Sequence, residues 1–187
     1  MGTRRHSQLG TLQVTSRQLK DTRGTSHTLH LILGGHIIGT IEESCSAQTW
    51  LSSASRLLDR LKSDFDKFKS PEFLGRSDYE IFELVWKANQ SESEFLPEYH
   101  HLPQLNNVIW SYCALHLDET IDAYLITITG HGDKIKLIWK GWREPCPLDE
   151  IDKLHSVTVD KNLLIKTLSD CVKYVNKDFQ NYKELTQ

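Results

Sequence analysis

The chain has 187 residues, of which 39% are hydrophobic and 25% charged, and its mean hydropathy is −0.44. A chain of this length and composition can bury a core of its own, which argues against a wholly disordered protein and an integral membrane protein. The formal net charge of −3 is the sum of unequal parts, which carry +4 over residues 1–39, −8 over residues 40–122 and +1 over residues 123–187.

The N-terminus and the cysteines favour a cytoplasmic protein. Arg4 and Arg5 are followed by polar residues, whereas a secretory signal requires an apolar stretch directly after its basic residues. The longest uncharged run, residues 24–41, is interrupted by glycines and histidines and is too short to cross a membrane. The four cysteines form no CxxC pair, so we expect reduced thiols and no disulfide framework.

The N-terminal part predicts a hairpin followed by a helix. Residues 1–24 are polar and basic and are interpreted as an arm or an edge strand, and residues 25–187 as a single domain. Two Leu- and Ile-rich segments, 27–33 and 36–41, are separated by Gly34-Gly35, a pair typical of a tight hairpin turn. Ser46 is placed to cap a helix over residues 47–68, in which apolar residues recur every three or four positions.

The middle of the chain predicts a short helix and a long loop. Ser77-Asp78-Tyr79-Glu80 has the capping-box spacing that begins a helix. Residues 91–107 contain two prolines and no sustained period, which indicates a loop. Residues 108–115 are rich in strand-forming side chains and predict a strand.

The C-terminal part predicts a second hairpin and a long helix. Segments 121–129 and 134–140 are joined by a Gly-containing turn, and the lysines of the second segment suggest that one of its faces is solvent-exposed. A short strand over 155–159 and a helix capped by Asp160 complete the order. The predicted class is therefore α+β, with an antiparallel sheet built from hairpins and packed with two longer helices and one short helix.

The sequence contains no specific catalytic or metal-binding motif. The sequence contains no GxSxG, SxxK or Gly-rich phosphate motif. Cys113 and His116, with His131, Cys146 and His155, could hold zinc, but Cys113 and His116 lie at the end of a predicted strand and would point to opposite faces. We predict no catalytic residue, metal or cofactor, and buried thiols at Cys113 and Cys171.

The strongest functional signal is an acidic stretch. Residues 77–122 carry nine acids against one base, Lys87, and several aromatic residues lie among them. A docking surface for a basic partner typically combines acidic residues, which steer the association, with aromatic residues, which anchor the bound partner. The predicted surface comprises Asp78, Glu80, Glu83, Trp86, Glu92, Glu94, Phe95, Glu98, Tyr99, Trp110, Asp118, Glu119 and Asp122.

The scheme of hairpin, helix and further hairpin also resembles a known group of proteins. The glycine-turn hairpin Leu29–Ile41 followed by a helix, and the later strand Lys136–Lys140, resemble immunity proteins of bacterial polymorphic toxin and contact-dependent inhibition systems. The resemblance implies a non-enzymatic, cytoplasmic protein that neutralises a cognate toxin, one whose basic charge would suit the acidic stretch. It carries over no binding residue by position.

Two other functions stay open at this point. Asp118, Glu119, Asp122 and His116 could form the centre of a metal-dependent hydrolase. A phage or secretion accessory protein would also need an interaction surface. Because the lysines of the C-terminal part are offset by neighbouring acids, we expect no nucleic-acid partner.

Overall fold

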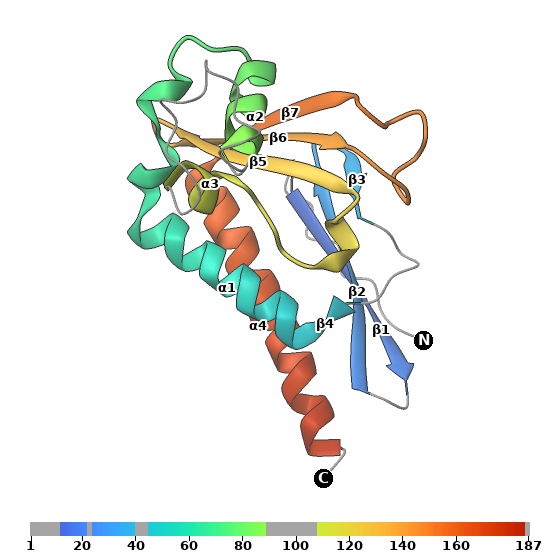
Figure 1. Ribbon diagram of the computed structural model, residues 1–187. Coiled ribbons are helices and arrows are strands. Elements are labelled where there is room, and N and C mark those ends of the chain that lie inside the picture. Colours follow the sequence, from blue (N-terminus) through green and yellow to red (C-terminus); the bar gives the residue numbers. More distant parts are fainter. Residues whose placement is uncertain (1–11, 22–23, 40–44, 89–107, 186–187) are drawn as a thin grey trace.

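The computed structural model describes residues 12–21, 24–39, 45–88 and 108–185, whose strands form two antiparallel sheets (Figure 1). In the first sheet, β2 pairs with β1 on one side and with β3 and β4 on the other. The second sheet has the order β5-β6-β7. The strand bounds are β1 Leu12–Asp21, β2 Gly24–Leu33, β3 His36–Ile38, β4 Cys45–Ser46, β5 Tyr124–His131, β6 Lys134–Gly141 and β7 Leu154–Asp160.

Four α-helices accompany the sheets within the described residues. They are α1 Ala47–Ser63, α2 Asp78–Lys87, α3 Val108–Cys113 and α4 Lys161–Leu185. None of the helices in the described part of the chain is long and apolar enough to cross a membrane. The α+β class is confirmed, and its antiparallel hairpins are divided between two sheets.

The predicted glycine hairpin is confirmed. Leu33 pairs with His36 across the turn, and Gly34 and Gly35 adopt φ angles of 55° and 88°, which favour glycine. The turn also meets the second sheet, since a Cβ at Gly34 would lie 3.7 Å from the Cβ of Val157. The two sheets therefore touch at this turn.

Two of the three predicted helix starts have the expected caps. Ser77 and Glu80 form a complete capping box at α2, and the Asp160 carboxylate accepts hydrogen bonds from two backbone N–H groups at the start of α4. Ser46 precedes α1 without a side-chain cap. The helix predicted over residues 47–68 ends at Ser63, and Phe65–Phe68 forms a separate 3-10 turn.

One main core joins both sheets to the two long helices. Figure 1 shows α1 and α4 running side by side below the second sheet. Buried side chains from α1, α4, β5, β6 and the β2–β3 hairpin meet in this core, including Trp50, Leu61, Ile126 and Trp139. Burial of these apolar side chains is the main favourable contribution to the stability of the fold.

The predicted solvent-exposed face of β6 is found only at Lys134, which is exposed, because α2 covers the rest of this face. Ile138 is fully buried and packs against Ile81 and Phe82 of α2, which covers this face. Lys136 and Lys140 are half-buried there, and the Lys140 ammonium lies 5.5 Å from the centre of the Phe82 ring. The long lysine side chains therefore pack along the apolar helix instead of extending fully into solvent.

The predicted strand over residues 108–115 is wrong as well. This segment begins with α3, and Ile109 and Cys113, four positions apart, bury one helical face against Leu84 and Val85 of α2. Packing between the two helices overrides the strand preference of these residue types. Cys113 and His116 therefore do not lie at the end of a strand.

Candidate functional site

The acids of α2 are held by contacts within the protein. The Asp78 carboxylate lies 2.6 Å from the Lys136 ammonium of β6. Burial works to raise the pKa of Asp78, but hydrogen bonds to Lys136 and Ser156 outweigh it and hold the pKa below its ordinary value. Asp78 thus ties α2 to the second sheet.

The other two predicted acids of α2 also have local partners. The Glu80 carboxylate accepts hydrogen bonds from the backbone N–H and the hydroxyl of Ser77, at 2.8 and 2.7 Å. Glu83 lies 3.3 Å from Lys87, one turn further along the helix. Glu83 and Lys87 are half-buried, and a pair between neighbouring turns of one helix contributes only a few tenths of a kcal/mol, about 0.2–0.5. These contacts reduce the charge that the helix presents to a partner.

Trp86 and Trp110 lie together with His116, which the sequence analysis considered only for a metal site. The two indole rings meet edge to face with centroids 5.1 Å apart, and the His116 ring lies 5.8 and 5.7 Å from them. The Trp86 Nε1–H donates a hydrogen bond to the Oγ1 of buried Thr127, at 3.1 Å. Trp86 therefore anchors the cluster to β5.

This aromatic cluster borders a shallow depression. Trp110, Ser111, Tyr112, Ala114, Leu115 and His116 line one part of it, and Ser53, Arg56, Leu57 and Arg60 of α1 line the other, around a volume of about 190 Å³. Desolvation of the ring lowers the pKa of His116, and the Asp122 carboxylate partly opposes this effect. The imidazole is therefore held toward its neutral form.

The last three predicted acids lie just beyond this cluster, at the 3-10 turn Glu119–Ile121. Asp118 is buried, whereas Glu119 and Asp122 are exposed. The Trp142 Nε1–H donates a 2.7 Å hydrogen bond to the Asp122 carbonyl, and the Arg143 guanidinium lies 4.7 Å from the centre of the Trp142 ring. Trp142 is 45% exposed, so an aromatic side chain lies at the surface beside the acids.

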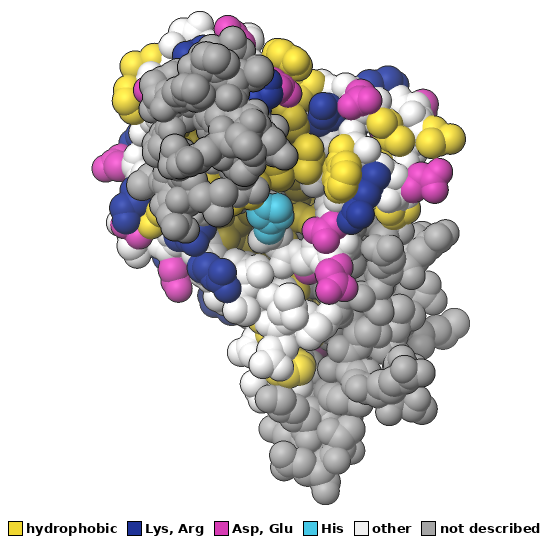
Figure 2. Space-filling model, in the orientation of Figure 1, with side chains coloured by type: hydrophobic (Ala, Val, Ile, Leu, Met, Phe, Trp, Pro, Cys, Tyr) yellow, Lys and Arg dark blue, Asp and Glu magenta, His cyan; other side chains and the backbone are white. Residues whose placement is uncertain are grey.

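Figure 2 shows this face of the molecule. A histidine lies near the centre of the view, and acidic, basic and hydrophobic side chains gather beside it. We call the exposed residues His116, Glu119, Asp122 and Trp142, together with half-buried Trp110, the turn surface. It keeps part of the predicted acidic surface, whereas Glu92, Glu94, Phe95, Glu98 and Tyr99 lie outside the described residues.

Trp142, Arg56 and Arg60 were missed by the sequence prediction. Trp142 follows β6 directly in a proline-containing segment, and a large aromatic residue in such a loop is a signal that could have found it. The two arginines lie on α1, far from the acidic stretch in the chain, and nothing local in the sequence points to their position beside Trp110.

The alternative hydrolase centre is not formed. Within the described part of the chain, a group of three side chains with ligand atoms within 4.8 Å of one another occurs at His36, Glu150 and His155, and Asp118, Glu119, Asp122 and His116 make no such group. The proposed zinc set around Cys113 and His116 is likewise not assembled.

The thiols have the character of core side chains. Cys113 is fully buried, and this burial raises its pKa to about 12. Cys171 is only half-buried, and burial raises its pKa to about 11. Neither thiol is ionised near neutral pH, which makes both poor nucleophiles.

Comparison with known proteins gives one sequence family and one similar structure. The model of a family described as Immunity protein 42 matches residues 18–174. The crystal structure of CdiI from Burkholderia dolosa AUO158 is similar with a TM-score of 0.59 and 15% sequence identity, over 88% of this chain and 96% of that chain. At this identity the likeness is one of fold. No curated protein matches the sequence.

Proposed function

Because this chain belongs to the Immunity protein 42 family, we propose that it protects a bacterial cell by binding a cognate toxin directly, in the cytoplasm and without chemistry of its own. The observation that carries the proposal is the family match, which extends from the last residues of β1 through the second sheet to the middle of α4.

We propose that the toxin contacts the turn surface. Glu119 and Asp122 are exposed acids, and Trp142 supplies a large exposed ring held in place by a hydrogen bond to the backbone of Asp122. A fixed aromatic ring loses little conformational freedom on binding, and such rings are frequent energetic centres of interfaces. We include Glu92, Glu94 and Glu98 in the proposed surface only because they belong to the acidic stretch of the sequence.

The charge distribution supports a basic partner. Residues 40–122 carry a net charge of −8, although Asp78, Glu80 and Glu83 are engaged within the protein. Acids at the turn surface would raise the rate of encounter with a basic toxin and add less to the final affinity. Trp142 and Trp110 would supply the apolar contact that determines how slowly the complex dissociates.

Co-expression tests the proposed function. We expect this chain to restore growth of cells that produce the toxin domain encoded beside it, and the two purified chains to elute together as a complex in size-exclusion chromatography. An unrelated toxin domain is the control and should be neither bound nor neutralised. Protection without a complex would contradict direct binding.

Charge reversal tests the proposed surface. In the double variant Glu119→Lys/Asp122→Lys we expect the association rate with the toxin at low salt to fall about tenfold, because the acids no longer steer the encounter. The difference in association rate between the wild type and the double variant should shrink as salt is added, because salt screens the charges at these two positions. Stopped-flow or surface plasmon resonance measurements over a range of salt concentrations would show this.

Asp133→Lys is the matched control. Asp133 is also an exposed acid beside a strand of the second sheet, but it follows β5 whereas Asp122 precedes it. A strand of eight residues separates the two positions by about 25 Å. Each reversal changes the net charge by the same amount, so the control is compared with the single variant Asp122→Lys. An association rate that falls equally in these two single variants would assign the effect to net charge and not to the turn surface.

A further inference from the structure

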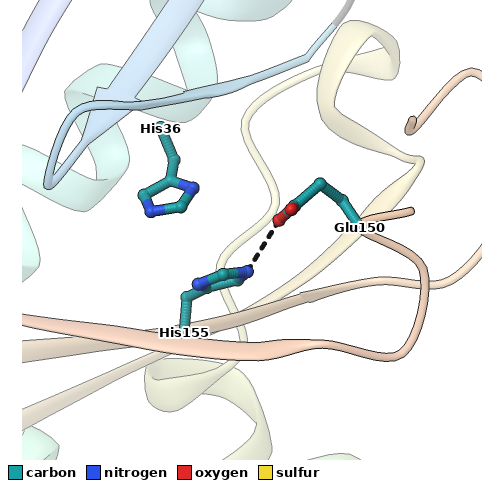
Figure 3. Close-up of side chains that lie close together, drawn as sticks. All are labelled: His36, Glu150 and His155. Atoms are coloured by element: carbon teal, nitrogen blue, oxygen red, sulfur yellow. Dashed lines mark hydrogen bonds and ion pairs between the residues drawn. The ribbon is translucent and has the colours of Figure 1, made fainter. Parts of the chain in front are cut away.

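A second group of side chains lies where the two sheets meet, and the turn surface does not use it. His36 comes from β3 next to the glycine turn, His155 from β7, and Glu150 from the segment between β6 and β7 (Figure 3). The imidazole centroids are 4.3 Å apart, and the His155 Nε2 lies 2.8 Å from the Glu150 Oε2. One ligand atom from each of the three residues lies within 4.8 Å of the other two.

The fold holds these side chains in place. Buried Trp139 of β6 stacks against the His155 ring with an interplanar angle of 22° and meets the His36 ring edge to face, with centroids 5.6 and 5.7 Å away. The two histidines therefore share one rigid support. His36 is exposed and His155 and Glu150 are half-buried, so the group is open to solvent on one side.

We propose that His36, Glu150 and His155 bind a divalent transition-metal ion, with Zn²⁺ as the best fit. Two imidazole nitrogens and one carboxylate oxygen form a ligand set that zinc accepts in tetrahedral sites, and the fourth position is then left to water or to another molecule. This inference goes beyond toxin binding and does not depend on it.

The three ligand atoms lie within 4.8 Å of one another, so the exposed His36 ring must move in by up to about 1.5 Å to share an ion with the other two. Two ligand atoms held about 2.0–2.1 Å from a tetrahedral zinc ion lie about 3.3 Å apart. The present 2.8 Å contact between His155 and Glu150 must therefore lengthen by about half an ångström, as the metal replaces the proton between the two atoms. Figure 3 shows the His36 ring above the His155 ring and to the left of this contact, which it would join as the third ligand.

The charges around the group suit a cation. Glu150 also accepts a hydrogen bond from Lys153 at 3.3 Å, but through Oε1, which leaves Oε2 for the metal. Through Oε2 the carboxylate faces His155 and can coordinate the same ion as that ring.

Metal binding would connect the two sheets. His36 belongs to the hairpin of the first sheet and His155 to the edge strand of the second, where the Gly34 turn already approaches Val157. An ion held by both would fix this junction, and removing the ion would weaken it. The expected consequence is a protein whose thermal stability depends on zinc.

Zinc titration of the full chain tests the site. After removal of metal with a chelator, we expect isothermal titration calorimetry with Zn²⁺ alone to show one site, and the thermal midpoint to rise with added zinc. His36→Gln and His155→Gln should each weaken the affinity at least tenfold. His131→Gln, which changes an exposed histidine at the far end of β5, is the control and should bind as the wild type does.

Two results would overturn the proposal. Unchanged zinc affinity in His36→Gln would place the ion elsewhere, and this exposed residue can be changed without opening the core. Cobalt substitution of the wild-type protein gives an answer that needs no variant, because a thiolate-to-cobalt charge-transfer band would assign the metal to a cysteine. A cobalt spectrum of nitrogen and oxygen ligands, lost in His36→Gln, is the result that we expect.

Discussion

Trp139→Ala is expected to destabilise the protein by about 3–5 kcal/mol. The Trp139 side chain is 2% exposed, stands in the main core and lies against the ring of His155, and its Cη2 atom would be 3.8 Å from a Cβ at Gly34. Its removal therefore opens a cavity between the two sheets. Urea unfolding of the purified protein would show the loss as a lower midpoint with a similar slope.

Trp142→Ala is the matched control for this prediction. The residue type is the same and the position is three residues further along the chain, but Trp142 is 45% exposed and makes one hydrogen bond through its ring nitrogen. We expect a cost of about 1 kcal/mol, the net value of that hydrogen bond. A loss below 1 kcal/mol in Trp139→Ala would contradict the packing described for the junction of the sheets.

The elements that depend on local signals were predicted well. The Gly34-Gly35 turn needs positive φ angles, and the capping box at Ser77 needs a hydroxyl and a carboxylate three residues apart, so a few neighbouring residues determine both structures. The hairpin of β5 and β6 also follows from a glycine turn between two strand-forming segments. These signals were sufficient to give the fold class.

The predictions were wrong where contacts between segments that are distant in the sequence determine the local structure. Residues 108–113 have the composition of a strand, yet contacts of Ile109 and Cys113 with α2 make them helical. The lysines of β6 indicate an exposed face, yet Asp78 and Phe82 of α2 cover it and accommodate the ammonium groups. In both places the missing information is the position of α2, which the sequence of the segment itself does not contain.

The candidate sites show the same division. An acidic stretch can be counted in the sequence, but the count cannot separate Glu80, which closes a helix cap, from Glu119, which is exposed at a turn. The group at the sheet junction could not be predicted from the sequence. His36 and His155 are more than a hundred residues apart, and only the approach of the two sheets brings them together. The sequence offers His155 as a zinc ligand only together with Cys113, His116, His131 and Cys146.

Gly141→Ala is expected to destabilise the protein by about 3 kcal/mol and to disturb both sites at once. A Cβ at Gly141 would overlap the Sγ of buried Cys146 and come within 3.3 Å of the Glu150 backbone carbonyl. The segment after β6 would have to move away from the strand. Because this segment carries Trp142 and Glu150, we expect weaker binding of the toxin and of zinc, together with a lower midpoint of urea unfolding.

Removal of the clashing sulfur tests this explanation. Cys146→Ala alone should cost about 1 kcal/mol, since it deletes one small buried group. In Gly141→Ala/Cys146→Ala the largest overlap is gone and only contacts of 3.3 Å with Cys146 Cβ and the Glu150 carbonyl remain. The double variant should therefore be more stable than Gly141→Ala, a coupling of at least about 1 kcal/mol between neighbouring sites. Additive losses would show that Gly141 is required for another reason, and that the segment bearing Trp142 and Glu150 is not positioned by its packing against Cys146.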